Sequence, residues 1–277
     1  MNPFTKRFMQ NKTIVVCGII LALIALAAMF APLIAPHDPT EMFQENRLES
    51  SSSNFLFGTD QFGRDLLSRI IYGARVSLIV GISSVLISVV FGTIFGLVAG
   101  YFGRWLDSVI MRCMDILFAF PEILLALAIV AALGPGTWNT ILAIGIVNIP
   151  IFTRTVRGAV LSVKNLEYVE SARAIGAKTG RILFLEIFPN VTAPLLVQGS
   201  LAISGAILTE SALSFLGLGI QPPDPSWGGM ISEARRYMEL APGMIVWPSV
   251  AMTITILAFN LFGDAIRDIL DPRHRGK

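Results

Sequence analysis

The chain has 277 residues, of which 54% are hydrophobic and only 14% are charged. Soluble domains carry roughly 25% charged residues, so this composition argues against a soluble globular protein and favours one that lies in a bilayer. The formal net charge of +2 is too small to indicate a nucleic-acid-binding protein. Two cysteines and two histidines, widely spaced, predict neither a metal site nor a catalytic set. We therefore expect a membrane protein without a metal, a cofactor or catalytic residues of its own.

Five long segments of the sequence contain no Asp, Glu, Lys or Arg. They cover residues 13–36, 76–103, 123–153, 187–209 and 240–263. A helix needs about 20 apolar residues to cross a bilayer, so each segment is long enough. The third contains the turn-forming cluster Gly134–Asn139 and is expected to divide into two helices there. The sequence thus predicts an all-α integral membrane protein with six spans. The predicted spans are residues 13–35, 77–101, 111–133, 138–157, 191–217 and 244–263.

Lys and Arg are distributed unequally between the segments that connect these spans. If the N-terminus is cytoplasmic, 15 of the 21 Lys and Arg residues lie on the cytoplasmic side. Cytoplasmic loops carry an excess of these residues, so both chain ends are predicted in the cytoplasm. The first span is longer than the apolar region of a signal peptide, which has about 7–15 residues. We therefore expect it to stay uncleaved and to anchor the chain in the membrane. We divide the chain into an anchor with an extracytoplasmic segment, residues 1–75, and a transmembrane domain, residues 76–277.

Two longer segments are predicted on the outer side of the membrane. In residues 57–75, charged residues alternate with Leu and Ile, which suits an amphipathic helix on the membrane surface. Such a helix would be either a platform for an external partner or a lead-in that anchors the second span. Residues 221–243 are rich in proline, and either partner binding or ordinary loop packing would explain them. The charged residues of the first segment are Asp60, Arg64, Asp65 and Arg69.

The second span carries a small residue at every fourth position. This spacing lets another helix approach its backbone closely, so we expect a helix-packing face rather than a permeation groove. The small residues are Ser84, Ser88, Gly92, Gly96 and Gly100.

Three polar side chains in the predicted spans are candidates for a pathway through the membrane or for its gate. Glu122 follows Pro121, which is expected to kink the third span, and is either part of a gate or an interfacial acid. Glu210 lies deep in the fifth span, where an ionisable group costs about 3 kcal/mol and usually faces protein or a water-filled cavity. It would either line the pathway or hydrogen-bond to a neighbouring helix. Gln198, three turns earlier, is the third candidate.

Residues 165–190 form a charged, helix-forming insert between the fourth and fifth spans, on the cytoplasmic side. Asn165 is expected to be the N-cap of a helix, and the acidic residues Glu167 and Glu170 suit its positive end. Tyr168, Ala172 and Ile175 then follow one another on a narrow apolar stripe. The small residues Ala172 and Gly176 leave room beside that stripe for another surface.

The second half of the insert is predicted to be a short helix. Gly176 and Gly180 are expected to break the first helix, and a second one, Arg181–Phe188, is expected to end at Pro189. The letters IGAKTG in this region do not fit the phosphate-binding pattern GxxxxGK[ST]. The sequence therefore encodes no nucleotide site here, and any ATP that drives transport must be bound by another chain.

The insert resembles a known motif, the EAA loop of permeases in binding-protein-dependent ABC importers. The resemblance rests on Glu170-Ser171-Ala172 with Gly176, and on Ile187-Phe188-Pro189-Asn190, with Ser171 in place of the usual alanine. Three further stretches resemble the second (C-type) permease of the dipeptide, oligopeptide and nickel branch. They are FGTDQFGRDLLSRIIYGARVSL (57–78), SFLGLGIQPPDPSWGGMI (214–231) and AFNLFGDAIRDILDPR (258–273).

This resemblance implies a type I importer fold and a pore-forming permease subunit in a bacterial or archaeal plasma membrane. The implied partners are a second homologous permease, two cytoplasmic ABC ATPases that bind ATP and magnesium, an extracytoplasmic solute-binding protein and membrane lipid. The insert would dock on an ATPase and couple ATP hydrolysis to translocation. The residues implied in this docking are Glu167, Glu170, Ser171, Ala172, Gly176, Ile187 and Pro189.

The substrate is less closely defined than the type of transporter. Di- or oligopeptides are the first candidates, and nickel, a metal chelate or glutathione are the alternatives for the same type of permease. The absence of a His- or Cys-rich lining favours peptides. An ion-coupled secondary transporter with Glu210 as proton relay is more remote, because it would need inverted repeats that the sequence does not show. A membrane scaffold that transports nothing is the last alternative.

Overall fold

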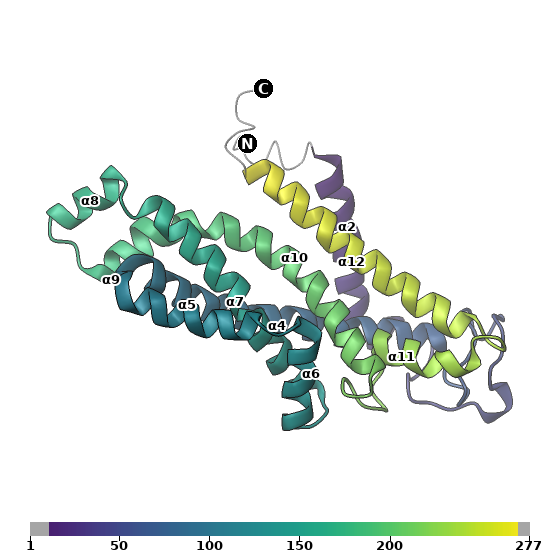
Figure 1. Ribbon diagram of the computed structural model, residues 1–277. Coiled ribbons are helices and arrows are strands. Elements are labelled where there is room, and N and C mark those ends of the chain that lie inside the picture. Colours follow the sequence, from purple (N-terminus) through teal and green to yellow (C-terminus); the bar gives the residue numbers. More distant parts are fainter. Residues whose placement is uncertain (1–10, 271–277) are drawn as a thin grey trace.

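The computed structural model describes residues 11–270, and its regular structure is almost entirely helical (Figure 1). Lys6, Arg7 and His274, which entered the charge and histidine arguments, lie outside the described residues. The long helices are joined by short turns, apart from the segment before α4 and residues 216–226 between α10 and α11. The elements are α2 (Lys12–Met29), α3 (Ala31–Ile34), η1 (Gln44–Asn46), α4 (Leu66–Phe102), α5 (Arg104–Phe118), α6 (Glu122–Leu133), α7 (Thr137–Val163), α8 (Glu167–Ala174), α9 (Thr179–Arg181), η2 (Ile182–Ile187), α10 (Phe188–Phe215), α11 (Trp227–Ala234), η3 (Arg235–Tyr237) and α12 (Gly243–Leu270).

Five helical segments of this structure are long and apolar enough to cross a membrane. They are α2, α4, α7, the run Thr179–Phe215 that joins α9, η2 and α10, and α12. The sixth predicted span exists only if the bent pair α5 and α6 is counted as one crossing. The predicted all-α integral membrane fold is thereby confirmed.

The kink predicted at Pro121 in the span 111–133 is confirmed, but it is a complete break between two helices and not a bend within one helix. α5 ends at Phe118 and α6 begins at Glu122, and the two helices are bent by 90° relative to each other. Pro121 causes the interruption, because it lacks an N–H donor, has an extended backbone (ψ 133°) and disfavours helical geometry at the preceding residue. We call residues 119–121 the elbow. Figure 1 shows α5 beside α4 and α7, with α6 projecting away from them.

The α4–α7 pair forms the centre of the helical packing. A Cβ atom built on Gly92, Gly96 or Gly100 would lie only 2.4–2.7 Å from a Cβ atom of α7. Ser88 donates a hydrogen bond from its hydroxyl to the carbonyl oxygen of Gly145 in α7 (2.8 Å). The row of small residues is therefore a helix-packing face, as the sequence predicts.

Residues 57–75 do not form a helix on the membrane surface; residues 66–75 are the first turns of α4 and lead into the second span, which is the second of the two predicted alternatives. Asp65 is the N-cap of α4, which then continues without a break across residues 75 and 76. Arg64 is buried and pairs with Asp60 (2.6 Å) and with Glu233 of α11 (3.0 Å). These charges therefore face protein rather than water, because a partner from α11, 169 residues later in the chain, closes over them.

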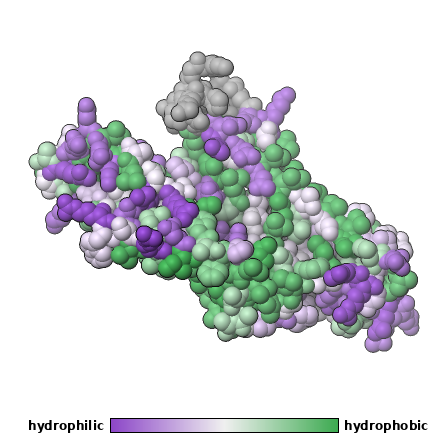
Figure 2. Space-filling model, viewed as in Figure 1, coloured by the Kyte–Doolittle hydropathy of each residue, from purple (hydrophilic) through white to green (hydrophobic). Residues whose placement is uncertain are grey.

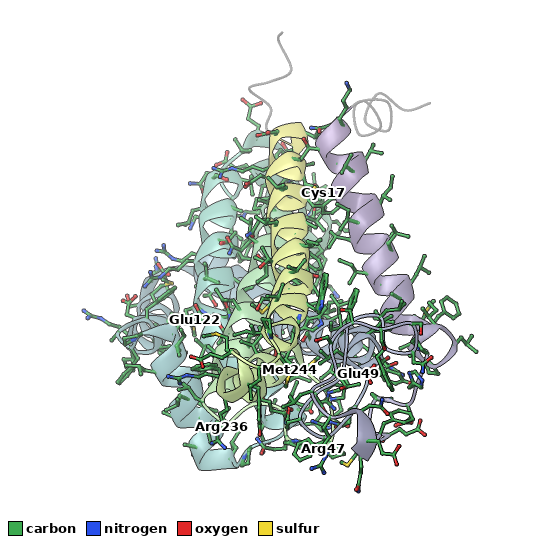
Figure 3. The ribbon with its side chains drawn as sticks, turned by 90° about the vertical axis from the view of Figure 1, so that its right-hand side faces the viewer. Cys17, Arg47, Glu49, Glu122, Arg236 and Met244 are labelled. Atoms are coloured by element: carbon green, nitrogen blue, oxygen red, sulfur yellow. The ribbon has the colours of Figure 1, made fainter. Side chains whose placement is uncertain are left out.

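The two outer segments lie at the same end of the molecule. Figure 3 shows α2 and α12 running lengthwise, with Arg47, Glu49, Arg236 and Met244 at one end and Cys17 towards the other. Trp227 of α11 is buried and donates its indole N–H to the carbonyl oxygen of Ile70 in α4 (3.1 Å). This arrangement agrees with the predicted topology, in which both segments are extracytoplasmic.

Candidate functional site

The cytoplasmic insert begins with α8, whose last turn is closed by a glycine. Gly176 has a positive φ of 78°, and its N–H donates to the carbonyl oxygen of Arg173 (2.9 Å). The N–H of Ala177 donates to the carbonyl oxygen of Ala172 (3.0 Å), which completes a Schellman cap. The predicted break at Gly176 is confirmed, and its cause is the left-handed conformation that only glycine adopts easily.

Three details of the predicted insert are wrong. The N-cap of α8 is Leu166, and it makes no side-chain capping bond, so Asn165 does not cap the helix. Gly180 lies inside α9 and breaks nothing. The second helix does not end at Pro189, because the helix continues from Thr179 to Phe215. Pro189 lies where the π-helical stretch Ile182–Ile187 passes into α10, and such a local change in the bonding pattern lets a residue without an N–H be tolerated inside the helix.

The docking candidates divide into exposed and buried residues. Ala172 and Ile187 are buried, together with Val169 and Ile182, in the main hydrophobic core of the chain. They therefore hold the insert on the spans and are not available to a partner at its surface. The exposed candidates are Glu167, Glu170, Ser171, Gly176 and Pro189.

The tip of the insert presents an apolar side chain between acidic and basic residues. Ile175 is 83% exposed, although an exposed isoleucine in water is unfavourable. A cavity of about 340 Å³ lies beside it, and Lys178 and Arg181 contribute to its lining. Figure 2 shows hydrophilic side chains gathered over this end of the molecule, where α8 lies. The sequence placed Ile175 on an apolar stripe but did not select it as a docking residue.

Basic residues attach the insert to the cytoplasmic end of α4. Lys164 donates from Nζ to the carbonyl oxygen of Gly100 (2.9 Å), near the C-terminus of α4, where a cation is favourable. The guanidinium of Arg173 in α8 lies 5.2 Å from the ring centroid of Tyr101, within cation–π range. The insert is therefore in direct contact with the cytoplasmic end of α4.

Two further arginines attach α7 to α5. Arg157 forms a bidentate pair with Asp107, with N–O distances of 2.5 and 2.7 Å. Arg154 pairs with Asp115 (2.7 Å), and its guanidinium lies 4.1 Å from the ring centroid of Phe118, the last residue of α5. These contacts, together with those of Lys164 and Arg173, form a basic ladder that runs from the insert to the elbow. The sequence counted these cations only as an excess of cytoplasmic charge.

Glu210 is fully buried within the chain (0% exposed). It accepts a hydrogen bond from the hydroxyl of Ser214 (2.7 Å), one turn along the same helix. α10 is closely covered on both sides here: a Cβ atom on Gly228 of α11 would lie 2.4 Å from the Cα atom of Ser211, and one on Gly81 of α4 would lie 3.0 Å from Ile207. This enclosure favours the structural role for Glu210 over a role in lining the pathway.

The other two pathway candidates are accessible. Glu122 is exposed at the start of α6 and accepts a hydrogen bond from the hydroxyl of Thr209 in α10 (3.1 Å). Gln198 is half-buried and, with Arg267 of α12, lines a cavity of about 410 Å³ between α10 and α12. Within residues 11–270, no group of three or more His, Cys, Asp or Glu residues is arranged to hold a metal ion.

The sequence matches two described families. Residues 92–276 match the binding-protein-dependent transport system inner membrane component, and residues 4–51 match the N-terminal TM domain of oligopeptide transport permease C.

Several curated proteins are similar over almost the whole chain. The dipeptide transport system permease protein DppC of Alkalihalophilus pseudofirmus is 48% identical over 99% of this chain and 91% of its own length. The di/tripeptide transport system permease protein DppC of Pseudomonas aeruginosa is 46% identical, over 99% and 92%. The glutathione transport system permease protein GsiD of Pectobacterium atrosepticum is also 46% identical, over 98% and 90%.

Among solved structures, a chain of the MetNI methionine ABC transporter in an inward-facing conformation has a similar fold. Its TM-score is 0.61 at 17% identity, and the match covers 74% of this chain and 98% of that one. At this identity the similarity concerns the fold alone.

Proposed function

Because this chain belongs to the family of binding-protein-dependent transport system inner membrane components, we propose that it is the permease subunit through which an ATP-driven importer carries di- and oligopeptides into the cell. Relatives named for dipeptide and di/tripeptide transport, at 48% and 46% identity, support peptides as the substrate. The location in the inner membrane follows from the family, and the helices long enough to cross a membrane agree with it.

The observation that carries the coupling role is the anchored, exposed insert. Its acidic first turn and the apolar side chain of Ile175 are free to contact a partner, while Ala172 and Ile187 fix it on the core. A cytoplasmic ABC ATPase that binds ATP and magnesium is the partner for this surface. A second homologous permease completes the pathway, and a second ATPase docks on it. ATP binding moves the two inserts, and the basic ladder transmits this movement to α4 and α5.

A glutathione permease is the second candidate, favoured by the 46% identical relative named for glutathione transport. The two candidates share the coupling mechanism and differ only in the cargo. Uptake by proteoliposomes that contain both permeases and the ATPases, with the solute-binding protein on the outside, separates them. We expect ATP-dependent uptake of alanylalanine. Uptake of glutathione but not of alanylalanine would reverse the choice of cargo, and uptake driven by a proton gradient without ATP would overturn the importer proposal.

The docking surface is tested by Gly176→Trp. Nothing lies within 4 Å of a Cβ atom at Gly176, so the tryptophan side chain overlaps no atom near that position in this chain. It would instead occupy the space that a docked ATPase needs. We expect the variant to lose its ATPases on co-purification and to lose uptake. Gly176→Ala is the matched control, because both variants bear the backbone strain of a positive φ, about 1 kcal/mol, but only Trp adds bulk. Equal recovery of ATPases with wild type and with Gly176→Trp would refute the docking role.

A further inference from the structure

A cavity lies between α10 and α12, near the ends of these helices that are predicted to be cytoplasmic. The two helices come close at Gly263, where a Cβ atom would lie 3.0 Å from the Cβ atom of Ser200. Beyond this contact they separate, and Figure 1 shows the yellow end of α12 standing away from the beginning of α10. The cavity between them has a volume of about 410 Å³, within the range of about 300–1,000 Å³ that is common for ligand sites.

The lining of this cavity combines one cation with a mostly apolar wall. Arg267 of α12 carries the charge, whereas its acidic neighbours on the helix, Asp264 and Asp268, are exposed and do not contribute to the lining. The wall is one face of α10, because its members follow the helical spacing i, i+3, i+4 and i+7. These members are Pro194, Val197, Gln198 and Leu201. The cavity therefore has a cationic edge beside a wall in which Gln198 is the polar member.

The length of α12 gives the depth of Arg267 in the membrane. At 1.5 Å per residue, its 28 residues span about 42 Å, and a tilt of about 20° shortens this to about 39 Å along the membrane normal. The hydrocarbon core is about 30 Å thick, so roughly 5 Å of a centred helix extends beyond it at each end. Arg267 lies three residues before Leu270, or roughly 4.5 Å from the end of α12. Its long side chain can therefore reach the lipid headgroups, while the apolar wall borders the acyl chains.

We propose that this cavity binds an anionic phospholipid of the cytoplasmic leaflet. The guanidinium of Arg267 pairs with the headgroup phosphate, for which its planar set of donors is well suited. The amide of Gln198, which lies nearer the contact at Gly263, is placed for the ester oxygens of the glycerol. Val197 and Leu201 contact the acyl chains, which a free phosphate ion does not have. Basic pockets between transmembrane helices on the cytoplasmic side are typical sites for anionic headgroups.

This inference does not depend on the cargo of the transporter. It assigns Gln198 to a lipid site rather than to the pathway for the transported substrate.

Two substitutions separate the cationic edge from the apolar wall. Arg267→Gln removes the charge but keeps a polar side chain, and Val197→Phe adds bulk to the wall without changing the charge. Arg112→Gln is the matched control, because Arg112 of α5 is exposed, lies on the predicted cytoplasmic side and does not line this cavity. Each variant is purified as the complete transporter, and its assembly is checked by co-purification of the second permease and the ATPases. Native mass spectrometry then counts bound lipids in mixed micelles of phosphatidylcholine with increasing amounts of phosphatidylglycerol.

We expect the wild type to retain a phosphatidylglycerol molecule that Arg267→Gln binds about fivefold more weakly. This factor corresponds to about 1 kcal/mol, the contribution of one cation near a membrane surface. Val197→Phe should weaken the same binding, because the bulkier side chain occupies space that the acyl chains need. Arg112→Gln should bind as the wild type does, and phosphatidylcholine, which has no net charge, should not replace phosphatidylglycerol.

Equal affinity for phosphatidylglycerol in the wild type and in Arg267→Gln would overturn the lipid site, and so would equally tight binding of phosphatidylcholine. Unchanged binding in Val197→Phe would overturn the placement of the lipid in the cavity. If Arg267→Gln lost the second permease but kept the lipid, the cavity would belong to the interface between the permeases. If it lost substrate uptake but kept the lipid, the cavity would belong to the pathway, and either result would refute the proposal.

Discussion

The α4–α7 contact predicts a large effect for one added methyl group, Gly96→Ala. A Cβ atom at Gly96 would lie 2.6 Å from the Cβ atom of Val156 and 2.8 Å from the carbonyl oxygen of Thr153. Neither atom belongs to the mobile end of a side chain, so rotation about a side-chain bond cannot relieve the overlap. The two helices must therefore move apart, and the packing on both sides of the contact loosens with them.

The magnitude follows from two opposing effects. Overpacking of a well-filled interior costs typically 1–3 kcal/mol. Alanine in a helix is favoured over glycine by roughly 0.5–1 kcal/mol, which offsets part of that cost. We expect a net loss of about 1–2 kcal/mol in the free energy of unfolding. Gly158→Ala, in α7, is the matched control: nothing lies within 4 Å of its Cβ position, so it gains the helix preference without the clash.

Thermal unfolding of the purified complex measures this difference. For a chain of this size, 1 kcal/mol shifts Tm by roughly 2–4 °C, so Gly96→Ala should lower Tm by several degrees while Gly158→Ala leaves it unchanged or raises it. Uptake should fall with Gly96→Ala as well, because the insert is carried by the cytoplasmic ends of α4 and α7. Equal Tm values for the two variants would refute the close packing.

Two further predictions concern charged groups. Asp107→Arg and Arg157→Asp should each reduce peptide uptake while the amount of ATPase that co-purifies stays the same, because each breaks a partly exposed bidentate pair worth about 1 kcal/mol. The exchange of both residues should restore most of the uptake. Failure of the double variant to recover would contradict a role of the pair itself. Glu210→Gln should assemble and transport nearly as well as the wild type, because the glutamine side-chain oxygen still accepts the hydrogen bond from Ser214. Glu210→Leu should lower Tm, because it leaves polar groups of the buried site unpaired. A loss of transport in Glu210→Gln with an unchanged Tm would favour the pathway role instead.

Local patterns in the sequence were sufficient for much of the fold. The charge-free segments predict where helices cross the membrane, and the row from Ser84 to Gly100 predicts the face on which α4 packs, because both depend on residues close together in the chain. Gly176 could be recognised as the end of α8 for the same reason. Capping was predicted less well: Asn165 has the right chemistry, but α8 begins one residue later with Leu166 as its N-cap.

The candidate site was predicted only in part, because burial depends on distant partners. Ala172 and Ile187 belong to the motif, yet they are buried in the core and do not form the surface of the insert. The exposed Ile175 could have been selected from the stripe, since its neighbours on that stripe were already placed on α8. For Glu122, the sequence showed a proline and an acid but not the contact with Thr209, 87 residues away.

The sequence by itself determined that the chain is a helical membrane protein, which side the insert is expected to face, and the family to which its motifs point. Composition, charge-free length and motif spacing are properties of contiguous residues and need no knowledge of the fold. Only the tertiary structure decided that Asp60, Arg64 and Arg69 are enclosed with Glu233, that α6 leaves α5 at 90°, and that a basic ladder joins the insert to the elbow. Each of these depends on side chains far apart in the sequence, whose meeting is set by how the helices pack.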